Sequence, residues 1–291
     1  MKKRENYGMR IISNIALILL AVMCIIPFMT VISSSLTNED MLVTYGYNVI
    51  PRKFDISAYK TLFSNANTLI NSYKVTIFVT AVGTFGAILV GSQFAYVISR
   101  KECVFAKYLS VYLFITMLFS GGMVPWYILI TRYLHLKDSL WALILPCLVN
   151  AWNIFLLKSN LSAVPNEVIE SARIEGAGEF YIFYKIVIPM AASGIATVAI
   201  FIMLSFWNDW YNNMLFITTP SKYSLQYMLQ NLMSNIEALQ IAQTTMGADV
   251  GDIPKNSIRM ATCIAAAGPM IFVFMFLQKY FVRGITVGAI K

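Results

Sequence analysis

Long apolar blocks constrain this chain more than any other feature of its sequence. Of its 291 residues, 58% are hydrophobic and 12% are charged, against about 25% charged residues in soluble domains. The blocks approach the roughly 20 residues that a helix needs to cross about 30 Å of hydrocarbon, and they lack the short alternating segments of an outer-membrane barrel. Because lipid offers the backbone no hydrogen-bond partners, we expect an all-α membrane protein.

Hydropathy predicts six transmembrane helices. We place them at Ile11–Ser33, Ile70–Ile98, Tyr108–Ile130, Leu140–Leu157, Met190–Ile217 and Ile258–Phe281. The first is predicted to be a retained helix, kinked at Pro27, rather than a signal peptide, because it is longer than a signal core and no convincing cleavage site follows it. The expected organisation is a cytoplasmic N-terminus at 1–10, one six-helix domain at 11–281 with a cytoplasmic loop at 159–189 and an external loop at 218–257, and a cytoplasmic tail at 282–291.

Basic residues indicate the orientation of these helices. They gather before the first span, after the second, around the loop between the fourth and fifth, and after the last: Lys2, Lys3, Arg4, Arg10, Arg100, Lys101, Lys107, Lys158, Arg173, Lys185, Lys279, Arg283 and Lys291. The positive-inside rule puts these segments and both termini in the cytoplasm. The net charge of +8 is thus interpreted as orientation and lipid contact, not nucleic-acid binding.

Residue types that carry catalysis or bind metals are sparse and scattered. Cys24, Cys103, Cys147 and Cys263 show no metal-ligand spacing and are expected to pack, and His135 lies in a short external turn. The sequence has no phosphate-binding loop and no hydrolase signature. We expect no enzymatic activity, no metal site and no cofactor bound by this chain, so that any energy for active transport must come from an ion gradient or a separate ATPase.

A polar island between the predicted fourth and fifth spans has a distinctive spacing. From Pro165 to Pro189 it predicts two short helices, with Pro165 in the first turn of one and glycines 176 and 178 at the break between them. After the break, apolar residues recur at helical spacing and predict a face along the membrane surface or the next span: Phe180, Phe183, Tyr184 and Val187.

This island resembles the EAA loop of ABC importer permeases, whose pattern is Glu-Ala-Ala, three residues, Gly, nine residues, Ile-x-Leu-Pro. The matching residues are Glu170, Ser171, Ala172, Gly176, Ile186 and Pro189, with Ser171 and Ile188 departing from the pattern. The resemblance implies that the loop docks onto an ATP-hydrolysing subunit. It further implies that Glu170 meets a basic group there, that Gly176 sets the turn, and that Ala172 allows close approach.

The resemblance extends over nearly the whole chain and is closest to the MalG-like permeases, in particular a subgroup serving complex sugars and oligosaccharides. The segments that carry it are Phe119–Pro125, Trp141–Pro146, Phe206–Asn213 and Leu277–Gly284. It implies a type I importer in the prokaryotic cell membrane. The expected partners are a second permease chain, two ATPases that use ATP and Mg²⁺, an external solute-binding protein, and a carbohydrate.

Polar residues at membrane depth are candidates for the solute pathway, because they are costly there unless they face a cavity or a partner. The candidates are Gln93, Asn150, Asn153, Trp207, Asn208, Asp209, Trp210 and Asn212, with Asn213 beside them. Aromatic rings beside amides and carboxylates suit a sugar. An aromatic belt at the external interface explains the tryptophans equally well.

Other interpretations remain open from sequence alone. The external segments Thr37–Leu69 and Thr218–Ser257 suit either a binding protein or the partner permease, and an amphipathic helix is expected in the second. The cargo could be a non-sugar solute. An ion-coupled transporter would need more intramembrane charge than Asp209, and a membrane sensor or scaffold would need no ATPase.

Overall fold

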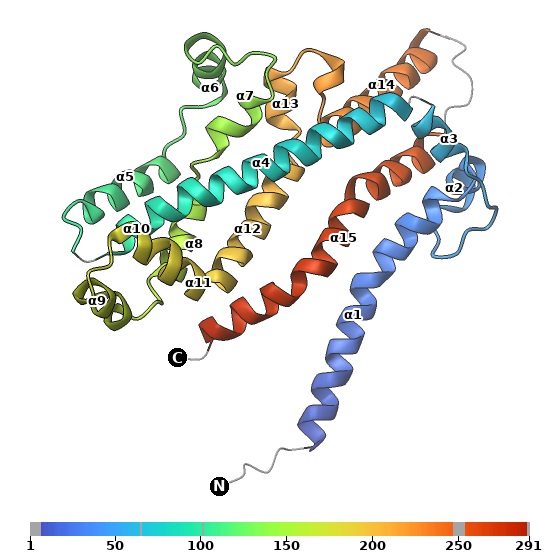
Figure 1. The fold of residues 1–291 in the computed structure, drawn as a ribbon. Coiled ribbons are helices and arrows are strands. Elements are labelled where there is room, and N and C mark those ends of the chain that lie inside the picture. Colours follow the sequence, from blue (N-terminus) through green and yellow to red (C-terminus); the bar gives the residue numbers. More distant parts are fainter. Residues whose placement is uncertain (1–6, 65, 101, 247–253, 290–291) are drawn as a thin grey trace. The chain divides into compact units, whose positions relative to one another are not determined.

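Helices make up most of the part of the chain that the structure describes. The computed structural model describes residues 7–64, 66–100, 102–246 and 254–289, and no strand occurs within these ranges, only one bridge between Thr37 and Phe54 (Figure 1). The predicted all-α class is confirmed. The chain divides into two compact units, Met1–Asn67 with Asn231–Pro269 and Thr68–Gln230 with Met270–Lys291, and each is described by itself.

Three helices are long and apolar enough to cross a membrane unbroken. They are α1 (Tyr7–Ser35), α4 (Ala66–Ser99) and α15 (Lys255–Ala289). They match the predicted first, second and sixth spans, and α1 continues through Pro27. The helix α15 includes most of the predicted tail, whereas residues 1–6 of the N-terminus and residues 290–291 lie outside the described ranges.

The predicted third, fourth and fifth spans are bent pairs rather than continuous helices, so the described chain has up to six crossings if each pair is one span. The third span combines α5 (Ala106–Leu118) with a second part made of α6 (Met123–Ile128) and the π-helical turn η1 (Leu129–Tyr133). The bend between the two parts is 114°. The fourth span combines a first part made of α7 (Trp141–Ile144) and η2 (Leu145–Cys147) with α8 (Ala151–Leu161). The bend between the two parts is 50°. The fifth span combines a first part made of α10 (Glu179–Tyr181), η3 (Ile182–Val187) and α11 (Ile188–Met190) with α12 (Ala192–Trp207). The bend between the two parts is 82°.

Glycine and proline explain two of these breaks. Gly122 has a φ of 83° immediately before α6, a backbone conformation that other residues adopt only at a cost. Pro146 lies inside η2, where it cannot donate a backbone hydrogen bond. Hydropathy located these spans but not their breaks. It averages over a window, so it does not show where a glycine or proline interrupts the backbone hydrogen bonds of a helix.

The remaining elements are short except for one amphipathic helix. They are α2 (Glu39–Tyr45), α3 (Ser57–Phe63), α9 (Asn166–Ile174), α13 (Tyr211–Phe216), η4 (Pro220–Lys222) and α14 (Leu225–Met246). The helix α14 occupies the segment where sequence periodicity predicts a helix, and residues 247–253 lie outside the described ranges.

In the first unit a carboxylate anchors the start of α15. Glu39, in the first turn of α2, accepts hydrogen bonds from the backbone N–H groups of Asn256 and Ser257, at 2.8 and 2.9 Å, and from both of their side chains. These N–H groups belong to the first helical turn, which has no intrahelical acceptor for them. The bonds therefore hold the segment after α1 against the beginning of α15.

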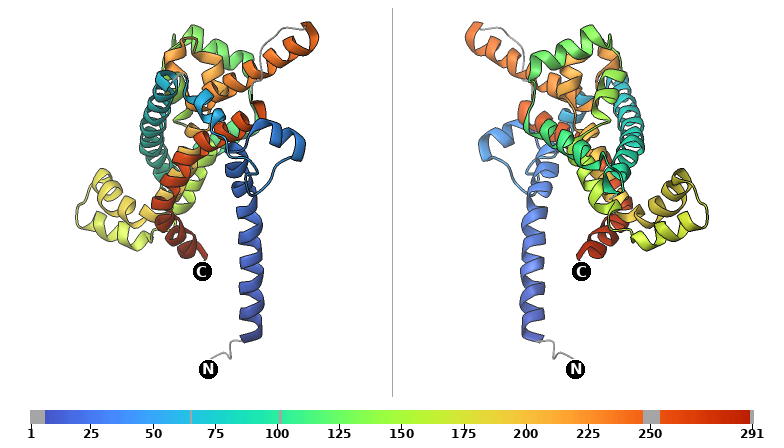
Figure 2. Two further views of the ribbon diagram at one scale, coloured as in Figure 1. Left: turned by 90° about the vertical axis from the view of Figure 1, so that its right-hand side faces the viewer. Right: turned by 90° about the vertical axis from the view of Figure 1, so that its left-hand side faces the viewer.

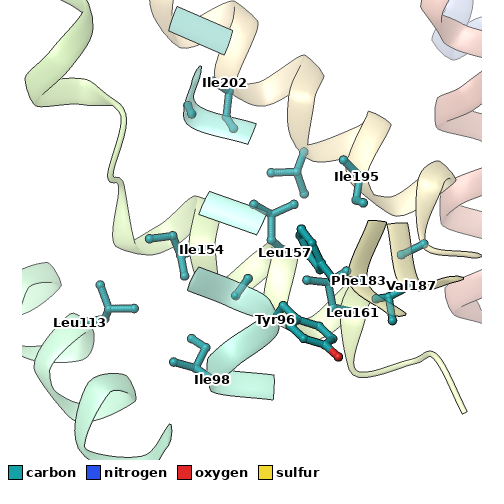
Figure 3. Packing of buried hydrophobic residues seen from close by; sticks show 14 of the residues in the cluster. Tyr96, Ile98, Leu113, Ile154, Leu157, Leu161, Phe183, Val187, Ile195 and Ile202 are labelled. Atoms are coloured by element: carbon teal, nitrogen blue, oxygen red, sulfur yellow. The ribbon is translucent and has the colours of Figure 1, made fainter. Parts of the chain in front are cut away.

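The core of the second unit lies where α4, α8, α12 and the segment 182–191 meet (Figure 3). Its most enclosed members include Ala95, Leu157, Leu161 and Val187, all at 0% exposure. Figures 1 and 2 show α9–α11 at one end of this unit and α6, α7 and α13 at the opposite end. The two ends are joined through α4, α8 and α12.

At the α6–α7–α13 end, Asp138 joins two loops that are far apart in sequence. Its carboxylate accepts bonds from the N–H groups of Thr218 and Thr219, at 3.0 and 2.9 Å, and pairs with Lys222 at 2.9 Å. The bonds from Lys222 and Thr219 hold the pKa of Asp138 well below its usual range. The loop around His135 is thus tied to the segment after α13.

Helices α8 and α12 approach so closely that position 194 has no room for a side chain. A Cβ on Gly194 would lie 2.0 Å from Asn160 Oδ1 and 2.9 Å from its Cβ. We expect Gly194→Ala to lower stability by about 1–3 kcal/mol through overpacking, measured as a lower melting temperature in detergent.

A second substitution tests that cause. Asn160→Ala removes the two closest atoms, so it should restore part of the stability when combined with Gly194→Ala. Gly268→Ala in α15, where a Cβ meets nothing within 4 Å, serves as the control. An unchanged melting temperature for Gly194→Ala would contradict the packing argument.

Candidate functional site

The first candidate site is α9, whose two faces differ sharply. Ile169 and Ala172 are buried, at 2% and 8% exposure, and Glu170 and Ser171 are exposed. Ile174 is 88% exposed and lies one helical turn after Glu170, on the same face. The helix therefore anchors itself through small and apolar residues and presents an acidic and apolar surface outward.

The turn after α9 depends on one glycine. Gly176 has a φ of 84°, and a Cβ there would meet nothing within 4 Å, so backbone conformation and not space calls for glycine. The turn is closed by a bond from the N–H of Ala177 to the carbonyl of Ala172. Gly178 has a φ of −74° and precedes α10 in extended conformation, so the glycine-dependent geometry expected at both positions occurs only at the first.

Charged residues brace this turn. Arg173 donates from Nε to Glu179 Oε1 at 2.7 Å, and Tyr96 of α4 donates to the other oxygen of Glu179 at 2.9 Å. The bond to Glu179 raises the pKa of Arg173. Arg173 also lies 3.8 Å from Glu102, in the loop after α4. The α9 hairpin is consequently tied to the end of α4 by a polar network.

The second half of the loop enters the core through a π-helical segment. Phe183 and Val187 are buried, and the Phe183 ring packs 5.0 Å from Tyr96 (Figure 3). Phe180 and Tyr184, predicted on the same apolar face, are exposed. Ile186 is partly buried and Pro189 is exposed at the start of α11.

The second candidate site is a polar cavity of about 280 Å³ inside the second unit. Four of the predicted pathway residues line it, namely Asn150, Asn153, Asp209 and Asn212. Asn150 caps α8 by accepting a bond from the N–H of Asn153 at 3.2 Å. The cavity thus forms where the bent fourth span and the end of the fifth place their unwound backbone beside each other.

The structure places the other predicted pathway residues elsewhere. Gln93 lies on α4 beside the α9 hairpin, donating to Tyr184 at 2.8 Å. Trp207 is buried at 5% exposure, and Trp210 is 42% exposed and packs edge-on against Tyr211. Asn208 accepts a bond from Gln226. Asn213, at 0% exposure, bonds to the carbonyl of Lys222. None of these five is among the described residues that line the polar cavity.

Sequence reasoning missed three residues at the two sites. Trp126 and Ser205 line the polar cavity, and Ile174 is the most exposed of the large hydrophobic residues of α9. Trp126 and Ser205 fall inside apolar blocks, where neither contrasts with its neighbours. The signal for Ile174 was present, since the periodicity of α9 places it opposite Ile169 and Ala172.

Comparison with known proteins identifies the class to which this fold and these sites belong. Residues 87–287 match the family described as binding-protein-dependent transport system inner membrane component. The chain belongs to this family. It is therefore a multi-pass membrane subunit of a solute transport system, as its loop motif predicts.

Particular relatives support the same assignment over almost the full length. The polygalacturonan/rhamnogalacturonan transport system permease protein YtcP of Bacillus subtilis (strain 168) is 34% identical over 275 residues, covering 94% of this chain and 95% of the relative. Protein LplC of the same organism is 34% identical over 267 residues, covering 92% of this chain and 89% of the relative. A crystal structure of a bacterial ABC transporter involved in the import of the acidic polysaccharide alginate aligns with a TM-score of 0.78 and 25% identity, covering 97% of this chain and 99% of that one. The predicted permease fold is confirmed.

The turn at Gly176 yields a matched pair of substitutions. Gly176→Ala forces a Cβ into the left-handed region, at a cost of roughly 1–2 kcal/mol, whereas Gly178→Ala leaves an ordinary φ. We expect the first to lower solute uptake and the second to leave it unchanged. Gly176→Asn should recover part of the activity because asparagine tolerates this conformation. Equal effects of the two alanine substitutions would contradict the role of the turn.

Proposed function

We propose that this chain is a permease subunit of an ATP-driven importer of oligosaccharides, and that α9 is its docking surface for an ATPase. The outward face of α9 carries this proposal. Ile174 is 88% exposed and has Glu170 one turn before it, and an exposed apolar residue beside an acidic one suits a pocket rimmed by a basic group on a partner.

The connections of α9 to the membrane helices explain how docking drives transport. The loop is held to α4 by the network of Arg173, Glu179 and Tyr96, and its second half packs into the core through Phe183 and Val187. Movement of α9 with an ATPase would therefore move α4 and α12. ATP and Mg²⁺ act on the ATPase, and this chain contributes a conformational change and no chemical step.

The names of the relatives and the lining of the polar cavity support a carbohydrate cargo. Relatives are named for polygalacturonan and rhamnogalacturonan, for arabinooligosaccharides and for galactooligosaccharides. The cavity offers amide groups from Asn150, Asn153 and Asn212, which can both donate and accept hydrogen bonds to hydroxyl groups. A second permease chain, two ATPases and an external solute-binding protein complete the proposed importer.

Docking is tested by two substitutions on α9. Ile174→Asp and Glu170→Ala should each weaken co-purification of the ATPase with the tagged permease, by on the order of tenfold or more in affinity, as expected for central interface residues. Val104→Asp, at a position 79% exposed in the loop after α4, is the control. Retention of the ATPase at wild-type levels in both α9 variants would exclude α9 as the docking surface.

The cargo is tested by uptake in a strain that lacks the gene. We expect loss of uptake of at least one labelled oligosaccharide from a panel of oligogalacturonides and of rhamnogalacturonan, arabino- and galactooligosaccharides. Complementation should restore it, and complementation with the Glu170→Ala variant should not. Unchanged uptake of all four classes in the deletion strain would reject the carbohydrate assignment.

A further inference from the structure

The polar cavity contains an aromatic ring whose position is fixed by its neighbours. Trp126 of α6 lines the cavity and is half-buried. Its indole N–H donates to Asn212 Oδ1 at 3.2 Å, and the Phe216 ring packs against it edge-on, with centroids 6.5 Å apart. A hydrogen bond at one edge and a ring contact beside it leave the indole little freedom to rotate.

Asp209 in turn fixes the orientation of Asn212. Its Oδ1 accepts from the backbone N–H of Asn212 at 3.0 Å, and its Oδ2 accepts from the side-chain Nδ2 at 2.8 Å. Reversing the Asn212 amide would bring two oxygens together at Asp209 and two N–H groups together at Trp126. The carboxylate therefore directs Asn212 Oδ1 toward the indole.

Unused hydrogen-bonding groups line the same cavity. Asn150 uses its Oδ1 to cap α8, and within the described part of the chain its Nδ2 and the whole side-chain amide of Asn153 have no hydrogen-bond partner. Asn150 is exposed and Asn153 is partly buried, so water can reach these groups when no solute is bound. Hydroxyl groups of a solute would satisfy them.

The charge and size of the cavity limit what it accepts. None of the described residues that line it is Lys or Arg, and Asp209 is its only charged side chain, so the carboxylate of an acidic sugar would find no cation there. Its volume of about 280 Å³ is close to the lower end of the roughly 300–1,000 Å³ of small-molecule pockets. A single uncharged ring fits these limits better than a complete oligosaccharide.

We propose that Trp126 is a stacking platform for one neutral sugar ring of the transported oligosaccharide, and that Asp209 acts through Asn212 as a positioning residue. The apolar C–H face of the ring packs on the indole, and its hydroxyl groups bond to Asn150 and Asn153. This assignment rests on the proposed function. In this arrangement the carboxylate of Asp209 orients Asn212, so its presence in the span does not require a role in ion coupling.

The test uses the complete importer in proteoliposomes, with its partner permease, ATPases and binding protein. The probe is whichever oligosaccharide of the four-class panel the wild type transports. Trp126→Leu should lower the maximal uptake rate on the order of tenfold, whereas Trp126→Phe should keep it within about threefold. The KM should change little in both, because the external binding protein sets it.

Two further variants separate positioning from general damage. Asp209→Leu should lower the uptake rate as Trp126→Leu does, and the double variant should be no worse than either single one, because both remove the same platform. Trp210→Leu, which alters a tryptophan outside the cavity, should transport normally. Basal ATP hydrolysis and melting temperature are measured on every variant to exclude misfolding.

The outcomes distinguish the platform from the proposed function. If the wild type moves a panel oligosaccharide and Trp126→Leu moves it equally fast, the platform is rejected while the importer stands. If Trp126→Phe is as slow as Trp126→Leu, ring stacking is rejected. If the wild type moves only the oligogalacturonides, whose rings all carry a carboxylate, the neutral-ring platform is rejected while the importer stands. If it moves no oligosaccharide of the panel, the carbohydrate assignment and the platform fail together.

Discussion

The hydrogen-bonding requirement of the backbone in lipid governs this structure. An uninterrupted helix satisfies that requirement by itself, and α1, α4 and α15 do so. The bent spans interrupt the pattern and must satisfy the freed groups in another way. At the start of α8 the side chain of Asn150 does this, and after α12 Asp209 accepts from the N–H of Asn212. The polar cavity lies between these two helix ends, so the side chains that accept bonds from the freed N–H groups also line the cavity.

The α9 hairpin is attached firmly to the rest of the second unit on one side. Its apolar side is anchored in the core through Ile169, Ala172 and Phe183. The bonds between Arg173, Glu179 and Tyr96 close the hairpin onto α4. Exposed ion pairs contribute little to stability alone, but here they fix the direction of a helix whose outward face stays available for a partner.

Two π-helical segments lie within the bent spans, and each is separated from the bend itself, which falls at residues 119–122 in the third span and at Ala191 in the fifth. The segment η3 leads from the hairpin into α12 through Pro189, and η1 follows α6 after the bend at Gly122. Such turns weaken regular hydrogen bonding and are frequent at functional sites in helices.

Much of this organisation could be predicted from the sequence because it depends on local properties. Apolar length determines which segments enter the membrane, and the residues from Glu170 to Pro189 carry a spacing that identifies the loop and its turn. The left-handed turn at Gly176 is similarly local, since only its own backbone conformation requires glycine.

Tertiary structure decided which polar residues meet. Asn150 and Asn212 are far apart in sequence yet line one cavity, whereas Asn208, in the same polar cluster as Asn212, does not line it. Trp126 gave no signal within its apolar block, because its role depends on a bond to Asn212 across the fold. The sequence by itself determined the apolar membrane segments and the spacing and turn of the α9 loop, since both depend on residues that are neighbours along the chain. Only the packing of bent helices decided the cavity, because bends and helix contacts place side chains from distant segments around one space.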